Sequence, residues 1–168
     1  MSGEGPSAPG EATLELLQEG EEQELFSAYA RIVADGDGFP HTPPLGWGEF
    51  ADYWLAHSAA VVLAREAGQL IGAYYLKPNF VGRAAHIANA GYFVVAAERG
   101  RGIGRLLVTD SIRRAPALGF DALQFNLVFA SNPARRLYEE LGFEVVGRLP
   151  RAVEGEDALI YWRTLPPA

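Results

Sequence analysis

The chain has 168 residues, no cysteine and a formal net charge of −7 at pH 7. Its length suits one domain with one core, and its 49% hydrophobic and 21% charged residues are typical of a globular protein. The lack of cysteine excludes disulfides, thiolate metal sites and a cysteine nucleophile, and the negative charge argues against nucleic acid as a partner.

The N-terminus shows neither a targeting segment nor a membrane span. Residues 1–10 (MSGEGPSAPG) are small and polar, with no basic start and no apolar run. We therefore expect a flexible tail at residues 1–11, a single domain at residues 12–168, and a soluble, cytoplasmic protein without a membrane partner.

The first half of the chain alternates apolar runs with polar turns. Hydrophobic spacing predicts a strand at 12–17, helices at 21–34 and 49–56, and strands at 59–65, 69–77 and 86–96. The segment Asp35–Gly48 is rich in glycine and proline, so we expect a loop. Its part from Phe39 to Trp47 either walls a substrate pocket or closes the core.

The second half repeats the alternation with two further helices. The pattern predicts a helix at 103–118 ended by Gly119, a strand at 121–129, a helix at 132–141 closed by Gly142, and strands at 143–148 and 158–164. The order βααβββαβαββ predicts an α/β (α+β) fold, with a largely antiparallel central sheet flanked by helices.

A glycine-rich turn, ERGRGIGRLL at residues 98–107, follows a predicted strand and opens a helix. Glycine permits positive φ, and unpaired N–H groups at a helix start attract anions. The turn therefore predicts a diphosphate site made of Arg99, Gly100, Arg101, Gly102, Ile103, Gly104 and Arg105. The alternative is a tight turn that binds nothing, with the arginines on a solvated helix face.

The spacing within this turn excludes the common nucleotide motifs. A G-x-G-x-x-G fingerprint would need glycine where Arg105 or Leu107 stands. A Walker loop needs a Gly-Lys pair, and Lys77 is the only lysine. The remaining pattern, Arg-x-x-Gly-x-Gly, resembles the pyrophosphate loop of the GNAT superfamily of acetyl-CoA-dependent N-acetyltransferases.

A second segment supports this resemblance, which extends from about residue 59 to residue 164. Ser131–Phe143 (SNPARRLYEELGF) is similar to the family helix that ends in Leu-Tyr-x-x-x-Gly-Phe. The resemblance implies acetyl-CoA as co-substrate, no metal, and Tyr138 as the acid that protonates the thiolate. Without the family, Tyr138 would be an amphipathic residue packed on a helix face.

The resemblance also assigns the pantetheine arm. Backbone groups of the strand before the glycine turn, at Phe93, Val94 and Val95, are expected to hold it where that strand splays from its neighbour at a bulge. The family asparagine lies seven residues before the tyrosine, where Ser131 stands, and Asn132 lies six before. Asn132 is expected to take this role, with Ser131 as the alternative.

The sequence does not reveal a general base. The strand from His86 to Val95 contains no carboxylate, and its polar members are His86, Asn89 and Tyr92. A lone histidine on such a strand is more often a structural residue, and an amine of depressed pKa can lose its proton to a chain of water molecules instead.

Three stretches are similar to the GNAT subgroup that acetylates L-azetidine-2-carboxylate and related cyclic imino acids. They are YYLKPNF at 74–80, HIANAGY at 86–92 and FNLVF at 125–129. The resemblance implies that Asn89 and Asn126 bind the substrate, and the alternative is that both amides satisfy strand ends. Arg83 is either an anchor for a substrate carboxylate or a solvated loop residue.

Three functions therefore stay open. The first is N-acetylation of a small molecule, an amino or cyclic imino acid. The second is acetylation of a protein N-terminus or lysine, which needs an open groove where the Asp35–Gly48 loop would otherwise close. The third is a non-catalytic acyl-CoA-binding module. Family members often form homodimers, and the terminal strands are the expected place for such a contact.

Overall fold

The computed structural model describes residues 11–168, so all of the predicted tail except Glu11 lies outside the described residues. The strands are β1 (Thr13–Leu16), β2 (Ala60–Glu66), β3 (Gln69–Pro78), β4 (Ile87–Val94), β5 (Ala122–Phe129), β6 (Glu144–Val153) and β7 (Glu156–Thr164). The α-helices are α1 (Glu22–Ala34), α2 (Trp47–Phe50), α3 (Ile103–Arg114) and α4 (Arg135–Glu140). Helix α2 continues as the π-helix η1 (Ala51–Leu55), and three short 3-10 helices are η2 (Gly82–Ala84), η3 (Ala96–Glu98) and η4 (Ala115–Leu118).

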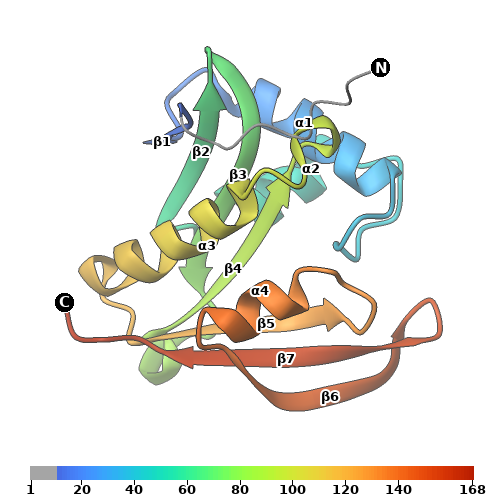
Figure 1. The fold of residues 1–168 in the computed structure, drawn as a ribbon. Coiled ribbons are helices and arrows are strands. Elements are labelled where there is room, and N and C mark those ends of the chain that lie inside the picture. The colour runs from blue at the N-terminus through green and yellow to red at the C-terminus, as the bar shows by residue number, and fades with distance from the viewer. Residues whose placement is uncertain (1–10) are drawn as a thin grey trace, which may run out of the picture.

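The strands form one sheet of seven in the order β1-β2-β3-β4-β5-β7-β6. Every neighbouring pair is antiparallel except β4 and β5. Figure 1 shows the sheet with α3 in front of β2–β4 and α4 in front of β5. The predicted fold, a largely antiparallel sheet flanked by helices, is confirmed.

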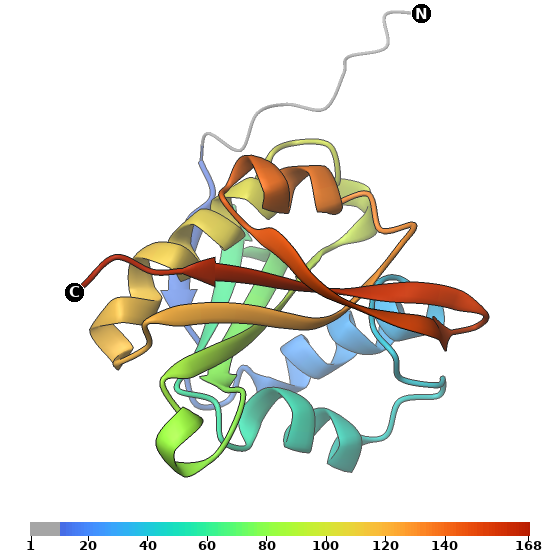
Figure 2. The same ribbon diagram turned by 90° about the horizontal axis from the view of Figure 1, so that it is seen from below.

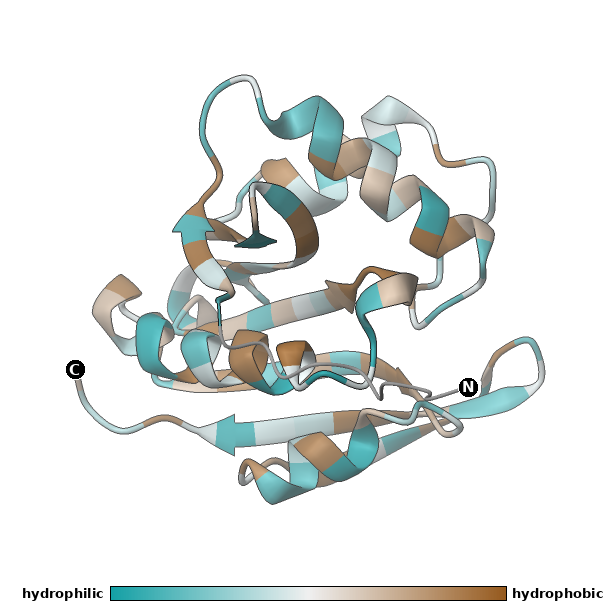
Figure 3. Cartoon of the chain, turned by 45° about the horizontal axis from the view of Figure 1, so that its top comes forward, coloured by the Kyte–Doolittle hydropathy of each residue, from teal (hydrophilic) through white to brown (hydrophobic). Residues whose placement is uncertain are grey.

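Helices cover both faces of the sheet, and the alternation of side chains along β3 divides the core into two clusters. Tyr74 and Leu76 belong to the cluster beneath α3, whereas Ala73 and Tyr75 belong to the cluster beneath α1, α2 and η1. Figure 2, seen from below, shows α3 and α1 on opposite sides of these strands. Each helix carries both hydrophobic and hydrophilic residues (Figure 3), as expected of helices with one buried side.

The two parallel strands separate soon after they begin. Their register contains only the pairs Ile87↔Ala122, Ala88↔Leu123 and Asn89↔Gln124. Beyond Asn89 the strands diverge, because β5 continues along β7 while β4 continues along β3 (Figure 1). The separation creates the space in which the site lies.

The expected bulge in the strand before the glycine turn is not found. Strand β4 keeps one register with β3 throughout their pairing. The shift occurs instead on β5, between Phe125 and Val128, where it pairs with β7. Asn126 and Leu127 lie in this irregular stretch and line the cavity described below.

Helix α4 begins three residues later than predicted. The Asn132 N–H donates to the Phe129 carbonyl (2.8 Å), and the Asn132 side-chain oxygen accepts from the Ala134 N–H (2.8 Å). The side chain thus competes with the helix for a backbone donor. Within residues 11–168, no helix has both the length and the apolar character needed to cross a membrane.

Candidate functional site

A cavity of about 760 Å³ occupies the space between the diverging strands β4 and β5. It is also lined by the loop after α1 and by the start of α4. The predicted site residues that line it are Asn89, Phe93, Val94, Arg99, Gly104, Asn126, Asn132 and Tyr138. The others, Val95, Gly100, Arg101, Gly102, Ile103 and Arg105, do not line it. The structure therefore brings the predicted acid, both substrate asparagines and one end of the glycine turn to one space.

The backbone of β4 has groups without a strand partner along this cavity. The Val95 N–H donates to Ile71 O (2.9 Å), and Val95 O accepts from the Glu98 N–H (2.8 Å). In an antiparallel pair, backbone groups point to the partner at every second residue, so those of Phe93 also face β3. The groups of Tyr92 and Val94 therefore face the gap. Of the three residues predicted to contact pantetheine, Val94 directs its backbone groups to the gap. The backbone groups of Phe93 face β3, and those of Val95 are bonded to Ile71 and Glu98.

The glycine turn has the conformation that an anion site requires. Gly100 and Gly102 have φ of 79° and 84°, values that favour glycine. Helix α3 starts at Ile103, and its first intrahelical bond runs from Leu106 N to Gly102 O. The N–H groups of Ile103, Gly104 and Arg105 thus precede the hydrogen-bond ladder, at the positive end of the helix dipole.

The arginines of the turn are all engaged with carboxylates. Arg99 pairs with Asp37 (3.0 Å), Arg101 with Glu66 (2.8 Å) and Glu98, and Arg105 with Glu140. The Arg101 side chain is only 8% exposed, so it serves to hold the turn against β2. The backbone amides are consequently better placed for a diphosphate than the Arg101 guanidinium.

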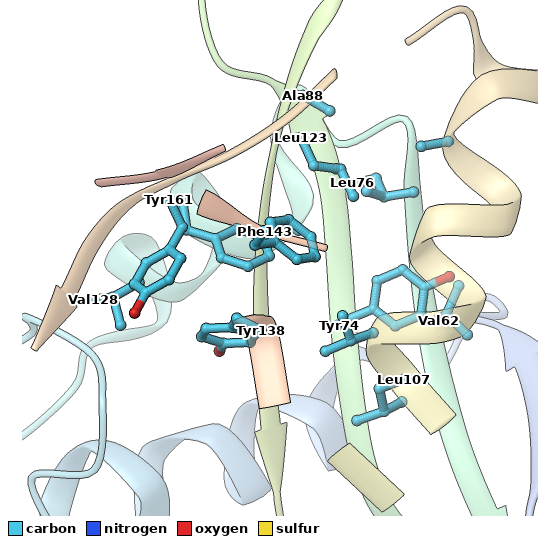
Figure 4. Packing of buried hydrophobic residues seen from close by; sticks show 14 of the residues in the cluster. Val62, Tyr74, Leu76, Ala88, Leu107, Leu123, Val128, Tyr138, Phe143 and Tyr161 are labelled. Atoms are coloured by element: carbon cyan, nitrogen blue, oxygen red, sulfur yellow. The ribbon is translucent and has the colours of Figure 1, made fainter. Parts of the chain in front are cut away.

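Tyr138 lies on α4 with its ring in the core and its edge on the cavity. It is 8% exposed and packs against Phe125 (4.8 Å between ring centroids) and Tyr161 (5.8 Å), as Figure 4 shows for Tyr161. Burial, and secondarily Tyr161, raises the pKa of its phenol above the ordinary value. The phenol is therefore protonated at neutral pH, which a proton donor requires.

The structure separates the roles of Ser131 and Asn132, although both line the cavity. The Ser131 hydroxyl donates to Glu156 (3.0 Å) on β7. The oxygen of the Asn132 amide bonds Ala134 N, and its nitrogen lies toward Gly38, on the loop after α1. The Asn132 amide nitrogen is thus the better placed donor for a ligand in the cavity.

Asn89 marks the last paired position of β4 and β5 and is fixed by two hydrogen bonds. Its oxygen accepts from the Tyr75 hydroxyl (3.1 Å), and its nitrogen donates to Gln124 O (3.1 Å). Tyr75 reaches Asn89 across Gly91, where a Cβ atom would lie 2.7 Å from the Tyr75 ring. A glycine is therefore required there.

Asn126 forms a mutual amide pair with Asn79. Asn126 Nδ2 donates to Asn79 Oδ1 (2.6 Å), and Asn79 Nδ2 donates to Asn126 Oδ1 (3.1 Å). This pair links the end of β3 to the irregular part of β5. Asn89 and Asn126 therefore line the cavity, and each is also hydrogen-bonded within the protein: Asn89 to the Gln124 carbonyl, and Asn126 to the Asn79 amide.

The loop after α1 closes one side of the cavity. Residues 36–40 line it, and Asp37 ties the loop to Arg99 of the glycine turn. The predicted wall is thus present at Phe39, whereas Trp47 packs against Phe26 and Phe50. His86 and Arg83 do not line the cavity.

Lys77 is a lining residue that sequence reasoning missed. It ends an apolar strand, QLIGAYYLK, where a lysine reads as a solvated terminus. The one signal in the sequence is its spacing of two residues from Tyr75, which places both side chains on the same face of the strand.

Comparison with known proteins gives one consistent family. The model of the acetyltransferase (GNAT) family matches residues 21–143. N-acetyltransferase aca1 of Schizosaccharomyces pombe is 42% identical over 104 residues, which are 58% of this chain and 50% of that protein. The chain therefore matches about half the length of this curated relative.

Solved structures give the same result over nearly the whole chain. A GCN5-related N-acetyltransferase from Kribbella flavida is 30% identical, with a TM-score of 0.86 over 94% of this chain and 100% of that one. A GNAT phosphinothricin acetyltransferase from Sinorhizobium meliloti, solved with acetyl-CoA, is 22% identical, with a TM-score of 0.82 over 92% of this chain and 89% of that one. The latter likeness shows the fold alone.

Proposed function

Since this chain belongs to the acetyltransferase (GNAT) family, we propose that it transfers an acetyl group from acetyl-CoA to the amine of a small amino or cyclic imino acid. The observation that carries this proposal is the cavity itself. It runs from the start of α3, past Tyr138, to an end lined by Asn89 and Asn126. Residues 36–40 of the loop after α1 also line it.

In this proposal the coenzyme lies between β4 and β5. The N–H groups at the start of α3 bind its diphosphate, the backbone of Val94 and the Asn132 amide bind the pantetheine arm, and Gly102 allows the tight approach. The amine nitrogen of the acceptor forms the new bond to the acetyl carbon while the bond to sulfur breaks. Tyr138 gives its proton to the departing thiolate, the nitrogen loses its N–H proton to water as the amide forms, and Tyr138 regains a proton from water.

The proposal needs no protein carboxylate as general base. Asp37 is the one acidic residue among the described residues that line the cavity, and it is paired with Arg99. The acceptor amine therefore loses its proton to water, and the free-amine form is the reactive species. The rate is expected to rise with pH as more of the acceptor amine is unprotonated.

The acceptor class rests on the resemblance to the subgroup that acetylates L-azetidine-2-carboxylate. Asn89 and Asn126, the positions which that resemblance assigns to the substrate, both reach the cavity. A cyclic imino acid has a compact apolar ring, which suits the aromatic lining of the cavity, and a nitrogen and a carboxylate, which suit the amides of Asn89 and Asn126.

A thiol-release assay with acetyl-CoA tests the proposal. The panel contains L-azetidine-2-carboxylate, L-proline, phosphinothricin, simple amines, and peptides with a free N-terminus or lysine. We expect thiol release with an amino or imino acid. Stabilisation by acetyl-CoA without release on any acceptor would instead identify a non-catalytic binding module, and release with peptides alone would identify a protein acetyltransferase.

A further inference from the structure

Lys77 places a positive charge at the acceptor end of the cavity. It lies on β3 in register with Asn89 of β4, and its side chain lines the cavity. Its Nζ donates to Tyr53 O (2.6 Å) and lies 4.2 Å from the Tyr53 ring centroid and 4.4 Å from that of Tyr75. A carbonyl oxygen and two aromatic faces all favour the ammonium form.

This charge has no acidic partner in the part of the chain that the structure describes. Three of the described lining residues are charged, namely Asp37, Lys77 and Arg99. Asp37 and Arg99 pair with each other at 3.0 Å, whereas no carboxylate of residues 11–168 lies within ion-pair distance of Lys77. Burial also lowers the pKa of the Lys77 ammonium, because the buried charge is not stabilised by a counter-ion.

We propose that Lys77 binds the carboxylate of the acceptor and thereby makes the enzyme specific for amino and imino acids over simple amines. This inference rests on the proposed function and adds to it the residue that selects the substrate. An ammonium has three donors, and the Tyr53 carbonyl uses one. Two remain to bind a carboxylate in the cavity, which also supplies the missing counter-ion.

The surroundings of Lys77 hold it in place for this task. Tyr53 comes from η1 and Tyr75 from β3, so two elements fix the ammonium from different sides. The Tyr75 hydroxyl also fixes Asn89, which presents its amide next to Lys77 in the β3–β4 register. The carboxylate site and the substrate asparagine are therefore set by the same tyrosine.

The test compares an acid with its neutral amide. The kinetics of L-azetidine-2-carboxylate and its carboxamide are measured with the wild type, Lys77→Met, Lys77→Arg and Arg83→Met. Arg83→Met removes one positive charge in η2, outside the cavity. We expect Lys77→Met to lower kcat/KM for the acid by about 30-fold or more, mainly through KM, as for loss of a charged hydrogen bond.

A neutral substrate and two further variants serve as controls. The carboxamide is expected to change by less than about 3-fold in Lys77→Met, Arg83→Met is expected to match the wild type, and Lys77→Arg is expected to recover part of the acid preference. Equal losses for acid and amide would overturn the inference and indicate a packing role. A loss confined to kcat, with a changed pH profile, would also overturn it and make Lys77 a general base.

A binding measurement separates this inference from the proposed function. Titration calorimetry of L-azetidine-2-carboxylate is performed with coenzyme A present, on the wild type and Lys77→Met. If no acid is acetylated but the wild type binds the acid and Lys77→Met does not, the proposed function fails and the carboxylate site stands. If both proteins bind it equally, or neither does, the Lys77 inference fails.

Discussion

Tyr138 is the proposed proton donor to the thiolate. Its hydroxyl is needed for that role, whereas its ring alone is enough for packing. In Tyr138→Phe the ring keeps its contacts with Phe125 and Tyr161, but the proton donor is lost. We expect kcat to fall about 100-fold, as for removal of a general acid, with KM for acetyl-CoA nearly unchanged.

A matched control lies in the same cluster. Tyr161→Phe also removes a buried hydroxyl, one that donates to Glu139 (2.9 Å) and does not reach the cavity. Its kcat should stay within about 3-fold of the wild type. Equal turnover by Tyr138→Phe and the wild type would assign Tyr138 to packing alone.

Because burial raises the pKa of Tyr138, ionisation of the phenol should not reduce kcat at any pH up to about 9.

Asn132 and Ser131 provide a second test between neighbouring residues. Asn132→Asp keeps the oxygen that accepts from Ala134 N but replaces the amide donor with a negative charge. We expect KM for acetyl-CoA to rise about 10-fold, whereas Ser131→Ala, which breaks only the bond to Glu156, should change it less than 2-fold. The opposite ranking would assign the pantetheine contact to Ser131.

At the scale of secondary structure, helix α3 begins and η4 ends at glycines with similar backbone conformations. Gly102 has φ of 84° before α3, and Gly119 has φ of 92° after η4. Alanine at either position should lower stability by about 1–2 kcal/mol, because a Cβ atom strains the left-handed conformation.

Only one of these two glycines belongs to the proposed diphosphate site. Gly102→Ala is expected to weaken acetyl-CoA binding at least about 10-fold, because it disturbs amides that converge on the diphosphate. Gly119→Ala should cost similar stability and leave the affinity unchanged. Calorimetric titration with acetyl-CoA and thermal unfolding of both variants measure the two effects separately, and equal affinities would contradict the anion site.

Helix α3 is also joined to β3 through a buried carboxylate. Asp110, with a side chain 5% exposed, accepts hydrogen bonds from Tyr74 (2.6 Å), Arg113 (2.6 Å) and Arg114 (3.2 Å). Burial opposes its ionisation, but these three donors outweigh burial and lower the pKa of the carboxyl below its ordinary value. The ionised form therefore stabilises the fold above the unfolded-state pKa, and this contribution is lost as pH falls through the lower folded-state pKa.

Asp110→Asn should reduce the free energy of unfolding by about 1–3 kcal/mol at pH 7, since the buried Tyr74 hydroxyl and the half-buried Arg114 guanidinium lose their charged acceptor. The difference from the wild type should shrink as the pH falls below about 4, where the carboxyl takes up a proton in the unfolded chain before it does so in the folded one. Urea unfolding at several pH values measures it. Asp121→Asn, at a largely exposed side chain, is the control, and an equal effect of both substitutions would contradict the stabilising role of Asp110.

The sequence predicted the order of strands and helices because most of them carry a hydrophobic period, and Gly119 and Gly142 mark the ends of two predicted helices. It also predicted that Tyr138, Asn89 and Asn126 meet at one site, through the family motifs. Details that depend on neighbours in space were not predictable. The position of the bulge is decided by how β5 pairs with β7, and the start of α4 by how the Asn132 side chain bonds.

Lys77 shows why charge is hard to interpret from sequence alone. A lysine at the end of a strand is ordinarily solvated, and only the packing of Tyr53 and Tyr75 makes it part of a cavity wall. The same holds for the arginines of the glycine turn, whose carboxylate partners come from β2, η3, α4 and the loop after α1.

At the scale of the whole molecule, the cavity lies where the two hydrophobic clusters meet. Phe93 and Tyr75 reach it from the cluster beneath α1, and Tyr92 and Tyr138 reach it from the side of α3 and α4. The sheet is open between these clusters only because β4 and β5 part after Asn89. A coenzyme can therefore pass between the strands and meet an acceptor at their point of divergence.

The loop after α1 forms part of the cavity wall. Its residues 36–40 line the cavity, and the Asp37–Arg99 ion pair joins the loop to the glycine turn. In the proposed function this loop limits the size of the acceptor, so a free amino or imino acid is expected to fit better than a polypeptide. The proposed specificity therefore depends on the size of the acceptor as well as on its amine and carboxylate.

The most direct test is the ratio of kcat/KM for L-azetidine-2-carboxylate to that for a peptide with a free N-terminus, measured by thiol release at one pH with acetyl-CoA in excess. The proposed function predicts that the imino acid is favoured by about 100-fold or more, as expected when the pocket binds the smaller acceptor and rejects the larger one. A ratio near one, or a preference for the peptide, would contradict the claim that the enzyme acts on a small amino or imino acid.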